Sequence, residues 1–553
     1  MRVLALAVAA SLMAGGLASA ETAPEFQPSP DRIRAHMAFL ASDLLEGREA
    51  GTRGYDIAAN YVAAEFAKLG LKPAGDAGSY LQRVPLTAYR PAGEGGVTLR
   101  ARSGRTTPLV FGQDYVPAAA PLGSETRVSA PLVFVGYGVA APAFGRDDYK
   151  GLDVRGKIVV MLAGAPKAIP GEERAHYGGR GKRLEAARRG AVGVITVWTP
   201  TRERVVPFER TRSTWRSWSM TWRGADGQAY FPGPGSPALA NVSLQGAEKL
   251  FAGAKVPWAK IVAAAEKKAG DPPRFDLPVT AEVALTTELK PMESANVAGL
   301  MPGSDPAVQD QVIVLSAHLD HLGITNPVNG DAINNGAMDN ASGIATMLEA
   351  ARGFAEGGRP PRRPLLFLAV TAEEKGLVGS EYFAHNPTLP KASLAGDVNL
   401  DMPILSYDFR DVTAFGGDRS SMGPAVRRAA QRLGLQVTPD ATPEEGIFTR
   451  SDHYRFVEQG IPAVFLKTGD LNGGAQATAA FRRDRYHRPS DDLSQPIDYA
   501  AGARFARVNY EIAREIADAH ERPTWNPGDF FGTLFNGPVG TTEGDGARRS
   551  PRP

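Results

Sequence analysis

Apolar residues recur at helical spacing near the start of the chain. Ser29 and Pro30 predict a helix N-cap followed by proline at the first helical position. One apolar face then comprises Ile33, Met37, Leu40 and Leu44. A second apolar face, which ends at Gly70, comprises Ala58, Val62, Phe66 and Leu69. Two helices are therefore expected before residue 71.

From about residue 290 onward, short apolar runs alternate with helical patterns. The predicted strands are Asn296–Met301, Val312–Ala317, Leu365–Val370, Val398–Met402 and Ala463–Leu466. The helical patterns between them include Ala341–Phe354 and Met422–Leu433. This alternation predicts an α/β fold with a largely parallel, mixed sheet sandwiched by helices. Ligands bind such sheets at the carboxyl ends of the strands.

The segment 125–245 has a different pattern, with short β-rich runs at Leu132–Val135, Lys157–Met161 and Val192–Val197. We expect it to be a small β-rich domain inserted into the main one, whose two parts would be 21–124 and 246–521. A tail, 522–553, is rich in Gly, Pro and Arg and is expected to be disordered at its end. Four of the six tryptophans lie between 198 and 222. They either pack the inserted domain or help to cover the mouth of a site.

Composition narrows the function. The chain has 553 residues, of which 43% are hydrophobic and 22% charged, as in globular proteins. Its net charge of +2 gives no support for nucleic-acid binding or a polybasic membrane anchor. The absence of cysteine excludes disulfides, thiolate metal sites and a cysteine nucleophile. Any metal must be bound by His, Asp and Glu.

The first 20 residues have the pattern of a signal peptide. Arg2 precedes the apolar stretch Val3–Leu17, and Ala18-Ser19-Ala20 fits the small-x-small rule for cleavage. An uncleaved membrane anchor is the alternative, but the apolar run is shorter than the ~20 residues that span a bilayer. We therefore expect export to the periplasm or medium, cleavage before Glu21, and no stable membrane insertion afterwards.

Polar residues follow the predicted strands where a crevice would lie. The candidates are His318, Asp320 and His321 after the second strand, Asp339 before a helix, Glu373 and Glu374 after the third strand, Asp401 after the fourth, and Tyr486 and His487 in a late loop. Each fragment alone has a bland explanation, such as a solvated Glu-Glu pair or a helix cap at Asn340 or Ser342. Together, however, imidazoles and carboxylates are the donors that zinc prefers, and two zinc ions need a bridging carboxylate.

At this point the chain resembles the M28 family of zinc metallopeptidases, specifically the bacterial di-zinc aminopeptidases of the leucyl aminopeptidase and aminopeptidase Y type. The matching motifs are Ala317–Gly323, Gly336–Gly343, Thr371–Ser380, Asn399–Met402, Ser451–His453 and Tyr486-His487. The inserted segment is similar to a protease-associated (PA) domain, most clearly at Gly151–Val159. The likeness covers most of residues 30–520.

The resemblance implies a role for each matching residue. His318 and Asp401 would bind one Zn²⁺ and Glu374 and His487 the other, with Asp339 as the bridge. Glu373 would be the general base, Asp320 the carboxylate that orients His318, and Tyr486 a hydrogen-bond donor to the developing oxyanion. His321 has no metal role in this scheme. Arg450 and His453 are expected near the substrate pocket, although a structural role for His453 remains open.

The implied activity is removal of N-terminal residues from peptides with a free N-terminus. The enzymatic alternatives are a one-zinc glutaminyl cyclase and a carboxypeptidase-like enzyme on the same fold. The non-enzymatic alternative is a binding protein that has lost catalysis. No Gly-x-Ser-x-Gly or His-Glu-x-x-His motif supports a serine hydrolase or a zincin.

Overall fold

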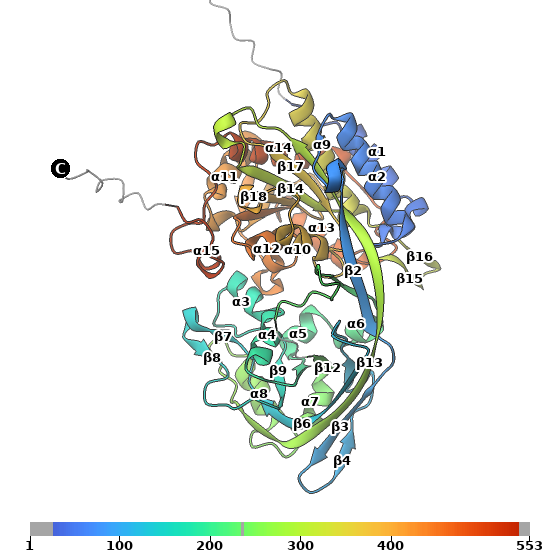
Figure 1. The fold of residues 1–553 in the computed structure, drawn as a ribbon, viewed down its shortest axis with the longest axis vertical. Coiled ribbons are helices and arrows are strands. Elements are labelled where there is room, and N and C mark those ends of the chain that lie inside the picture. The colour runs from blue at the N-terminus through green and yellow to red at the C-terminus, as the bar shows by residue number, and fades with distance from the viewer. Residues whose placement is uncertain (1–25, 234–236, 541–553) are drawn as a thin grey trace, which may run out of the picture.

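The computed structural model describes residues 26–233 and 237–540, which form two α/β units joined by a long β-ribbon (Figure 1). The upper unit in Figure 1 contains the main sheet. In spatial order its strands are β11 (Ser219–Trp222), β2 (Leu81–Pro91), β13 (Phe275–Met301), β17 (Leu365–Val370), β14 (Val312–His318), β18 (Leu394–Leu400), β21 (Ala463–Thr468), β19 (Asp411–Phe415) and β20 (Gln436–Thr438). The short β1 (Lys72–Pro73) pairs with the end of β13.

The centre of the main sheet is parallel, as the sequence predicts. Strands β17, β14, β18 and β21 run parallel, whereas β13 and β19 join them antiparallel. The strands at 312, 365 and 463 begin where the apolar runs begin, while β18 starts four residues before the predicted Val398. The mixed α/β sheet expected from the alternation is confirmed.

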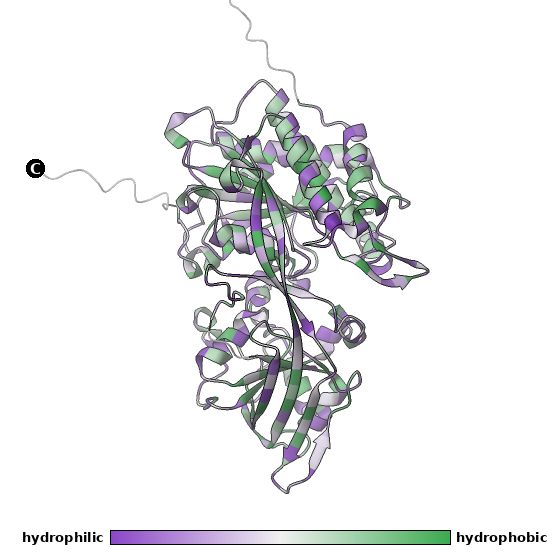
Figure 2. Cartoon of the chain, turned by 45° about the vertical axis from the view of Figure 1, so that its right-hand side comes forward, coloured by the Kyte–Doolittle hydropathy of each residue, from purple (hydrophilic) through white to green (hydrophobic). Residues whose placement is uncertain are grey.

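Helices cover both faces of the main sheet, because the central strands are apolar on both sides. One face packs under α1 (Pro30–Leu40), α2 (Arg53–Lys68), α9 (Ser342–Glu356), α11 (Met422–Arg432) and α14 (Tyr499–Asp518). The other face packs against α10 (Val378–His385), α12 (His453–Val457) and α15 (Phe530–Leu534). Alternate residues of one strand serve the two cores: Ile313 and Leu315 face the first, Val312 and Val314 the second. Figure 2 shows the resulting concentration of hydrophobic residues on the strands and the inner sides of the helices.

The two predicted N-terminal helices are present, but α1 ends at Leu40, so Leu44, expected on its apolar face, lies beyond the helix and is exposed. Ser29 caps α1 by accepting a hydrogen bond from the Arg32 amide, and Pro30 occupies the first turn. Helix α2 ends at Lys68, and Gly70 follows with φ +71°. Helix α1 lies beside α9, and α2 packs on β13, so both helices are part of the main unit.

The lower unit is built on a second sheet. Its strand order is β4 (Thr106–Pro108), β3 (Gly96–Ala101), the first part of β13, β6 (Glu125–Phe134), β9 (Ile158–Leu162), β10 (Gly193–Val197), β12 (Ala238–Val242) and β5 (Tyr115–Pro117). Its helices are α3 (Gly171–Gly178), α4 (Gly181–Arg188), α5 (Pro200–Val205), α6 (Phe208–Ser213), α7 (Leu244–Leu250) and α8 (Trp258–Ala265). Two small hairpins complete the fold: β7 (Ala140–Ala141) with β8 (Arg146–Asp147) here, and β15 (Gly323–Val328) with β16 (Asp331–Asn334) in the upper unit.

The second sheet extends beyond the expected segment 125–245 on both sides. It begins with β3 at Gly96 and includes β13 as far as Thr286, whereas β11, inside the expected segment, belongs to the main sheet. The reason is that β13 is one 27-residue strand whose two halves pair in different sheets. The likeness of this unit to a PA domain stays a prediction.

The two ends of the chain are only partly described. Residues 523–540 of the expected tail are folded: Trp525 is buried, its indole Nε1 donates to the Gly460 carbonyl, and it packs with Phe531 of α15 against the main core. Residues 541–553 and the predicted signal peptide 1–20 lie outside the described residues. No helix of the described part has the length and apolar character needed to cross a membrane.

Candidate metal centre

The predicted site residues meet at the carboxyl edge of the parallel strands. His318 is the last residue of β14, Glu373 follows β17, and Asp401 follows β18. Asp339 lies in the turn before α9, and His487 lies in the loop after α13 (Gly474–Asp484). Strand order places these ends side by side, so five chain segments deliver side chains to one crevice.

One group of donors consists of His318, Asp339 and Asp401. His318 Nε2 lies 3.3 Å from Asp339 Oδ1 and 3.3 Å from Asp401 Oδ1. The ligand atoms of the three residues all lie within 4.8 Å of one another. One imidazole and two carboxylates at this separation are a donor set that suits zinc.

Asp339 also belongs to a second group. Its Oδ2 lies 3.3 Å from His487 Nε2, which in turn is 3.1 Å from Glu374 Oε2. Asp339 thus turns one carboxylate oxygen toward each histidine. This is the arrangement that a carboxylate needs if it is to bridge two metal ions.

The orientation of His318 is set by a backbone group. His318 Nδ1 lies 3.1 Å from the carbonyl oxygen of Asp320, to which it can donate, and this leaves Nε2 free for a metal. The Asp320 carboxylate instead accepts from the amides of Glu373 and Glu374, at 3.0 and 3.3 Å. The carboxylate thus holds the Glu-Glu turn in place. Among the described residues it has no hydrogen bond with His318, and its expected role in orienting His318 stays a prediction.

The loop carrying Asp339 is held by Asn340. The Asn340 side-chain amide donates to the carbonyls of His318 and Leu400, and its oxygen accepts from the amides of Gly343 and Met402. Gly336 permits the tight approach of this loop, because at φ +58° an added Cβ would lie 2.2 Å from the Asp339 carbonyl oxygen. Asn340 thus joins three ligand-bearing segments besides supporting the start of α9.

Two charged residues that the motif analysis gave no role stabilise the same loop. The Asp491 carboxylate accepts from the amides of Met338 and Asp339, at 3.0 and 3.1 Å. The buried Arg48 guanidinium donates to the carbonyls of Leu319, Asn335 and Gly336. It is also a cation close to Asp320, Asp339 and Glu374, so it offsets part of the negative charge. Arg48 and Asp491 are far from each other in the sequence, and local patterns do not reveal such contacts.

The two adjacent glutamates occupy different electrostatic environments. Burial and then the neighbouring carboxylates, Glu374 among them, raise the pKa of Glu373 well above its usual value. Burial also acts on Glu374, but the imidazoles of His487 and His321 outweigh it and hold the pKa of Glu374 far below its usual range. Among the donor groups of the described residues, Glu374 belongs to one and Glu373 to none. This difference fits a pair in which Glu373 accepts a proton and Glu374 binds a metal.

His321 lies at the centre, contrary to expectation. Its Nδ1 is 2.7 Å from Glu374 Oε1, and it forms a donor group with Asp339 and Glu374. The resemblance assigns it no metal role, but the His-x-x-His spacing at the end of β14 could have indicated it. The structure places both His321 and His487 beside Glu374.

Tyr486 and His487 form one face of the site. Their rings stack with centroids 3.8 Å apart. Burial lowers the pKa of His487, but Glu374 and Asp339 outweigh this and raise it to about 9. Burial, together with Asp339, raises the pKa of Tyr486 far above its ordinary value, so its hydroxyl keeps its proton and can donate it in a hydrogen bond.

The two predicted substrate-binding residues differ. His453 is completely buried, with its ring 5.2 Å from the rings of both Phe448 and Phe465, which favours the structural role. Arg450 is exposed and acts electrostatically on Tyr486.

Two tryptophans of the segment 198–222 pack against aromatic side chains. Trp222 stacks on Tyr230, and Trp215 contacts Phe111. In the same segment, between Trp198 and Trp215, α6 brings Arg210 Nη2 to 3.3 Å from His487 Nδ1.

Three residues of the centre have left-handed backbone conformations without being glycine. They are Ala372, which precedes Glu373, Met402, which follows Asp401, and His487, with φ of 52°, 49° and 59°. Such conformations cost free energy and persist where the surroundings enforce them, often at functional sites. Here each one aims a predicted functional side chain into the crevice.

Comparison with known proteins agrees with the arrangement. Residues 296–513 match the family model described as Peptidase family M28. Over 244 residues the chain is 32% identical to leupeptin-inactivating enzyme 1 of Streptomyces exfoliatus, and over 261 residues it is 30% identical to a probable zinc metalloprotease of Pyricularia oryzae. Each alignment covers 41% of this chain and 51% of the relative, so the chain spans about half the length of these relatives.

The fold as a whole resembles a solved aminopeptidase from Aneurinibacillus sp. strain AM-1. The TM-score is 0.52 at 22% identity, over 90% of this chain and 96% of the other. The likeness therefore extends through both units of the structure. The segment that matches the model of peptidase family M28 contains every predicted metal ligand.

Proposed function

We propose that the protein is an exported di-zinc aminopeptidase that removes N-terminal residues from peptides. The observation that carries the proposal is the position of Asp339, whose two carboxylate oxygens face His318 and His487 separately. The relative that is named a zinc metalloprotease and the neighbour that is named an aminopeptidase support the metal and the reaction.

The residues present fit two zinc ions. His318, Asp401 and one oxygen of Asp339 would bind the first, and Glu374, His487 and the other oxygen of Asp339 the second. When bound, the ions would supply an acidified water and polarise the scissile carbonyl. His321 can add to the second set through its donor group with Asp339 and Glu374.

The chain's own groups account for the proton transfers. Glu373, which the donor groups leave unused and whose pKa is raised, accepts the proton of the attacking water and returns it to the leaving amine. Asp320 holds Glu373 in position through its backbone amide. Tyr486 keeps its hydroxyl proton and donates a hydrogen bond to the oxygen that becomes negative in the transition state.

A free N-terminus distinguishes this proposal from an endopeptidase. The substrate amine is cationic, and carboxylates around the metal centre can bind it. Leucine p-nitroanilide should be hydrolysed by the zinc-loaded enzyme, and N-acetyl-leucine p-nitroanilide should not. Equal hydrolysis of both compounds would contradict an aminopeptidase, as would hydrolysis of the blocked compound alone.

We also propose export. The support is the pattern of Arg2, the apolar Val3–Leu17 and the cleavage site before Glu21. Mass spectrometry of the protein isolated from the periplasm or medium of a Gram-negative host should find Glu21 at the N-terminus. Recovery of the full-length chain in the cytoplasm alone would overturn this assignment.

A further inference from the structure

The crevice is acidic at its centre, yet cations from both units surround it. Arg210 and Arg202 come from the lower unit, on α6 and α5, and Arg450 and Lys467 come from the upper unit. Among the described residues none of the four forms an ion pair with a carboxylate. A negatively charged group of the substrate, bound among these cations, could offset their charge.

Arg210 lies beside His487 and Tyr486. Its Nη2 lies 3.3 Å from His487 Nδ1, and its guanidinium lies 5.7 Å from the centre of the Tyr486 ring. A histidine that binds a metal through Nε2 carries its proton on Nδ1, which then cannot accept a hydrogen bond. With metal at His487, Arg210 would therefore be free to bind another acceptor.

Lys467 faces the same crevice from the main sheet. In the parallel pair of β18 and β21, Leu400 lies opposite Leu466, so Lys467 comes level with Asp401. Burial, with smaller contributions from Arg482 and Arg450, lowers the pKa of Lys467 to about 8, although Asp401 and Asp339 act in the opposite direction. The ammonium group is half-buried and makes no hydrogen bond within the described part of the chain.

Arg450 acts electrostatically on cations of both units, Arg202 of the lower unit and Lys467 of the upper unit. Burial first and Arg450 second lower the pKa of Arg202, so the two guanidinium groups lie close enough to repel each other. Arg450 also acts on both Tyr486 and Lys467. Like charges held close together repel each other, and a bound anion would reduce that repulsion.

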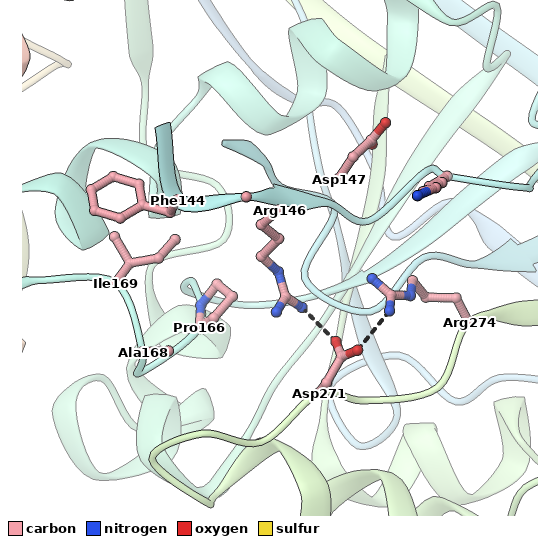
Figure 3. Close-up of a pocket in the computed structure, with 10 residues that line it drawn as sticks. Phe144, Arg146, Asp147, Pro166, Ala168, Ile169, Asp271 and Arg274 are labelled. Atoms are coloured by element: carbon pink, nitrogen blue, oxygen red, sulfur yellow. Dashed lines mark hydrogen bonds and ion pairs between the residues drawn. The ribbon is translucent and has the colours of Figure 1, made fainter. Parts of the chain in front are cut away.

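Two other arginines of the lower unit, Arg146 and Arg274, do form ion pairs with carboxylates. In the cavity of about 460 Å³ shown in Figure 3, Arg146 and Arg274 converge on Asp271, at 3.0 and 2.7 Å. Both arginines also pair with Asp148. Arg146 and Arg274 thus have carboxylate partners, whereas Arg210 and Arg202 at the crevice have none among the described residues.

We infer that Arg210 and Lys467, with Arg202 and Arg450 around them, form a subsite for a carboxylate of the peptide substrate. This inference rests on the proposed aminopeptidase function and specifies its substrate class. The carboxylate can come from an acidic N-terminal side chain or from the C-terminus of a short peptide, since both present the same two oxygens to guanidinium and ammonium donors. The lower unit then contributes directly to substrate choice.

Paired substrates separate the two sources. Glutamate p-nitroanilide against leucine p-nitroanilide tests the acidic side chain, and Leu-Gly against Leu-Gly-amide tests the C-terminal carboxylate. In the zinc-loaded wild type, the anionic member of at least one pair should have the higher kcat/KM. In Arg210→Gln and Lys467→Met the ratio of kcat/KM for the anionic member to that for the neutral member should fall about tenfold or more, mainly through KM. The control Arg216→Gln alters an exposed arginine of the same segment and should keep the wild-type ratio.

Calorimetry gives a second measure that does not depend on turnover. Binding of glutamate α-amide, leucine and leucinamide to the loaded enzyme should weaken in Arg210→Gln only for the ligands that carry the recognised carboxylate. If the wild type prefers neither anionic substrate, or if both variants keep its preference, the subsite does not exist. If the zinc-loaded wild type hydrolyses none of the four substrates, the proposed function itself fails.

Discussion

At the scale of single residues, we expect the two adjacent glutamates to have different roles: Glu374 binds a metal and Glu373 transfers a proton. Glu373→Gln keeps the size of the side chain but cannot accept a proton. We expect it to retain the metal and lose kcat by ~10²–10⁴, the range of general acid–base catalysis. Glu374→Gln removes an anionic donor and should weaken the second metal, with partial recovery at high zinc concentration. Kinetics over a zinc series and native mass spectrometry report both effects.

The control for this pair is the comparison of the two variants with each other. If Glu373→Gln lost metal and Glu374→Gln kept it, the roles would have to be exchanged. If both variants remained fully active, neither glutamate would take part in the reaction.

His453 makes a separate prediction about stability in acid. Burial lowers the pKa of His453 to about 3, whereas an unfolded histidine has a value near 6.5. Between these values the unfolded chain binds the additional proton, so this histidine reduces the free energy of unfolding as pH falls from 6.5 toward 3. In His453→Leu the slope against pH should be smaller by up to ~1.4 kcal/mol per pH unit.

Denaturant unfolding at several pH values between 4 and 6.5 measures this slope. His520→Leu is the control, because His520 is exposed with 89% of its side chain accessible. A His453→Leu slope equal to that of the wild type would mean that His453 is protonated inside the folded protein.

At the scale of elements, the turn before α9 determines where the bridging carboxylate lies. Asp491 accepts hydrogen bonds from the Met338 and Asp339 amides of this turn. Asp491→Asn places an amide donor against one of these amides. We expect zinc affinity to fall ~10- to 100-fold, as when groups that orient metal ligands are altered. Competition with a chromogenic chelator measures the affinity.

The neighbouring Asp492→Asn is the matched control for this variant, because within residues 26–233 and 237–540 Asp492 bonds only locally, to Ser494 and Gln495. It should keep the wild-type zinc affinity. Equal affinities for Asp491→Asn and the wild type would show that the turn holds its position without Asp491.

Sequence reasoning was most successful at this same scale. The apolar runs at β14, β17 and β21 are continuous and bounded by polar residues, so they predict buried parallel strands, and the residues that follow them predict the crevice. The actions of Asp320 and Asp491 were not predictable, because each depends on a backbone amide of a distant segment. A carboxylate beside a histidine in sequence need not be its partner in space.

At the scale of the whole molecule, the long strand β13 explains why the predicted bounds of the inserted unit, 125–245, are narrower than the observed second sheet. It is one continuous strand from Phe275 to Met301, and no turn marks where it leaves one sheet for the other. The same ribbon positions the lower unit so that α6 reaches His487. The approach of Arg210 to the metal centre could not be predicted from local pattern.

The central claim is that this geometry holds two zinc ions that are required for peptide hydrolysis. The most direct measurement is native mass spectrometry of the purified protein, with leucine p-nitroanilide hydrolysis followed on the same samples during chelation and zinc addition. The account predicts two zinc ions per chain, no activity in the metal-free protein, and recovery as the second ion binds. Full activity in a verified metal-free sample would contradict it, and full activity with a single zinc ion would contradict the bridging role of Asp339.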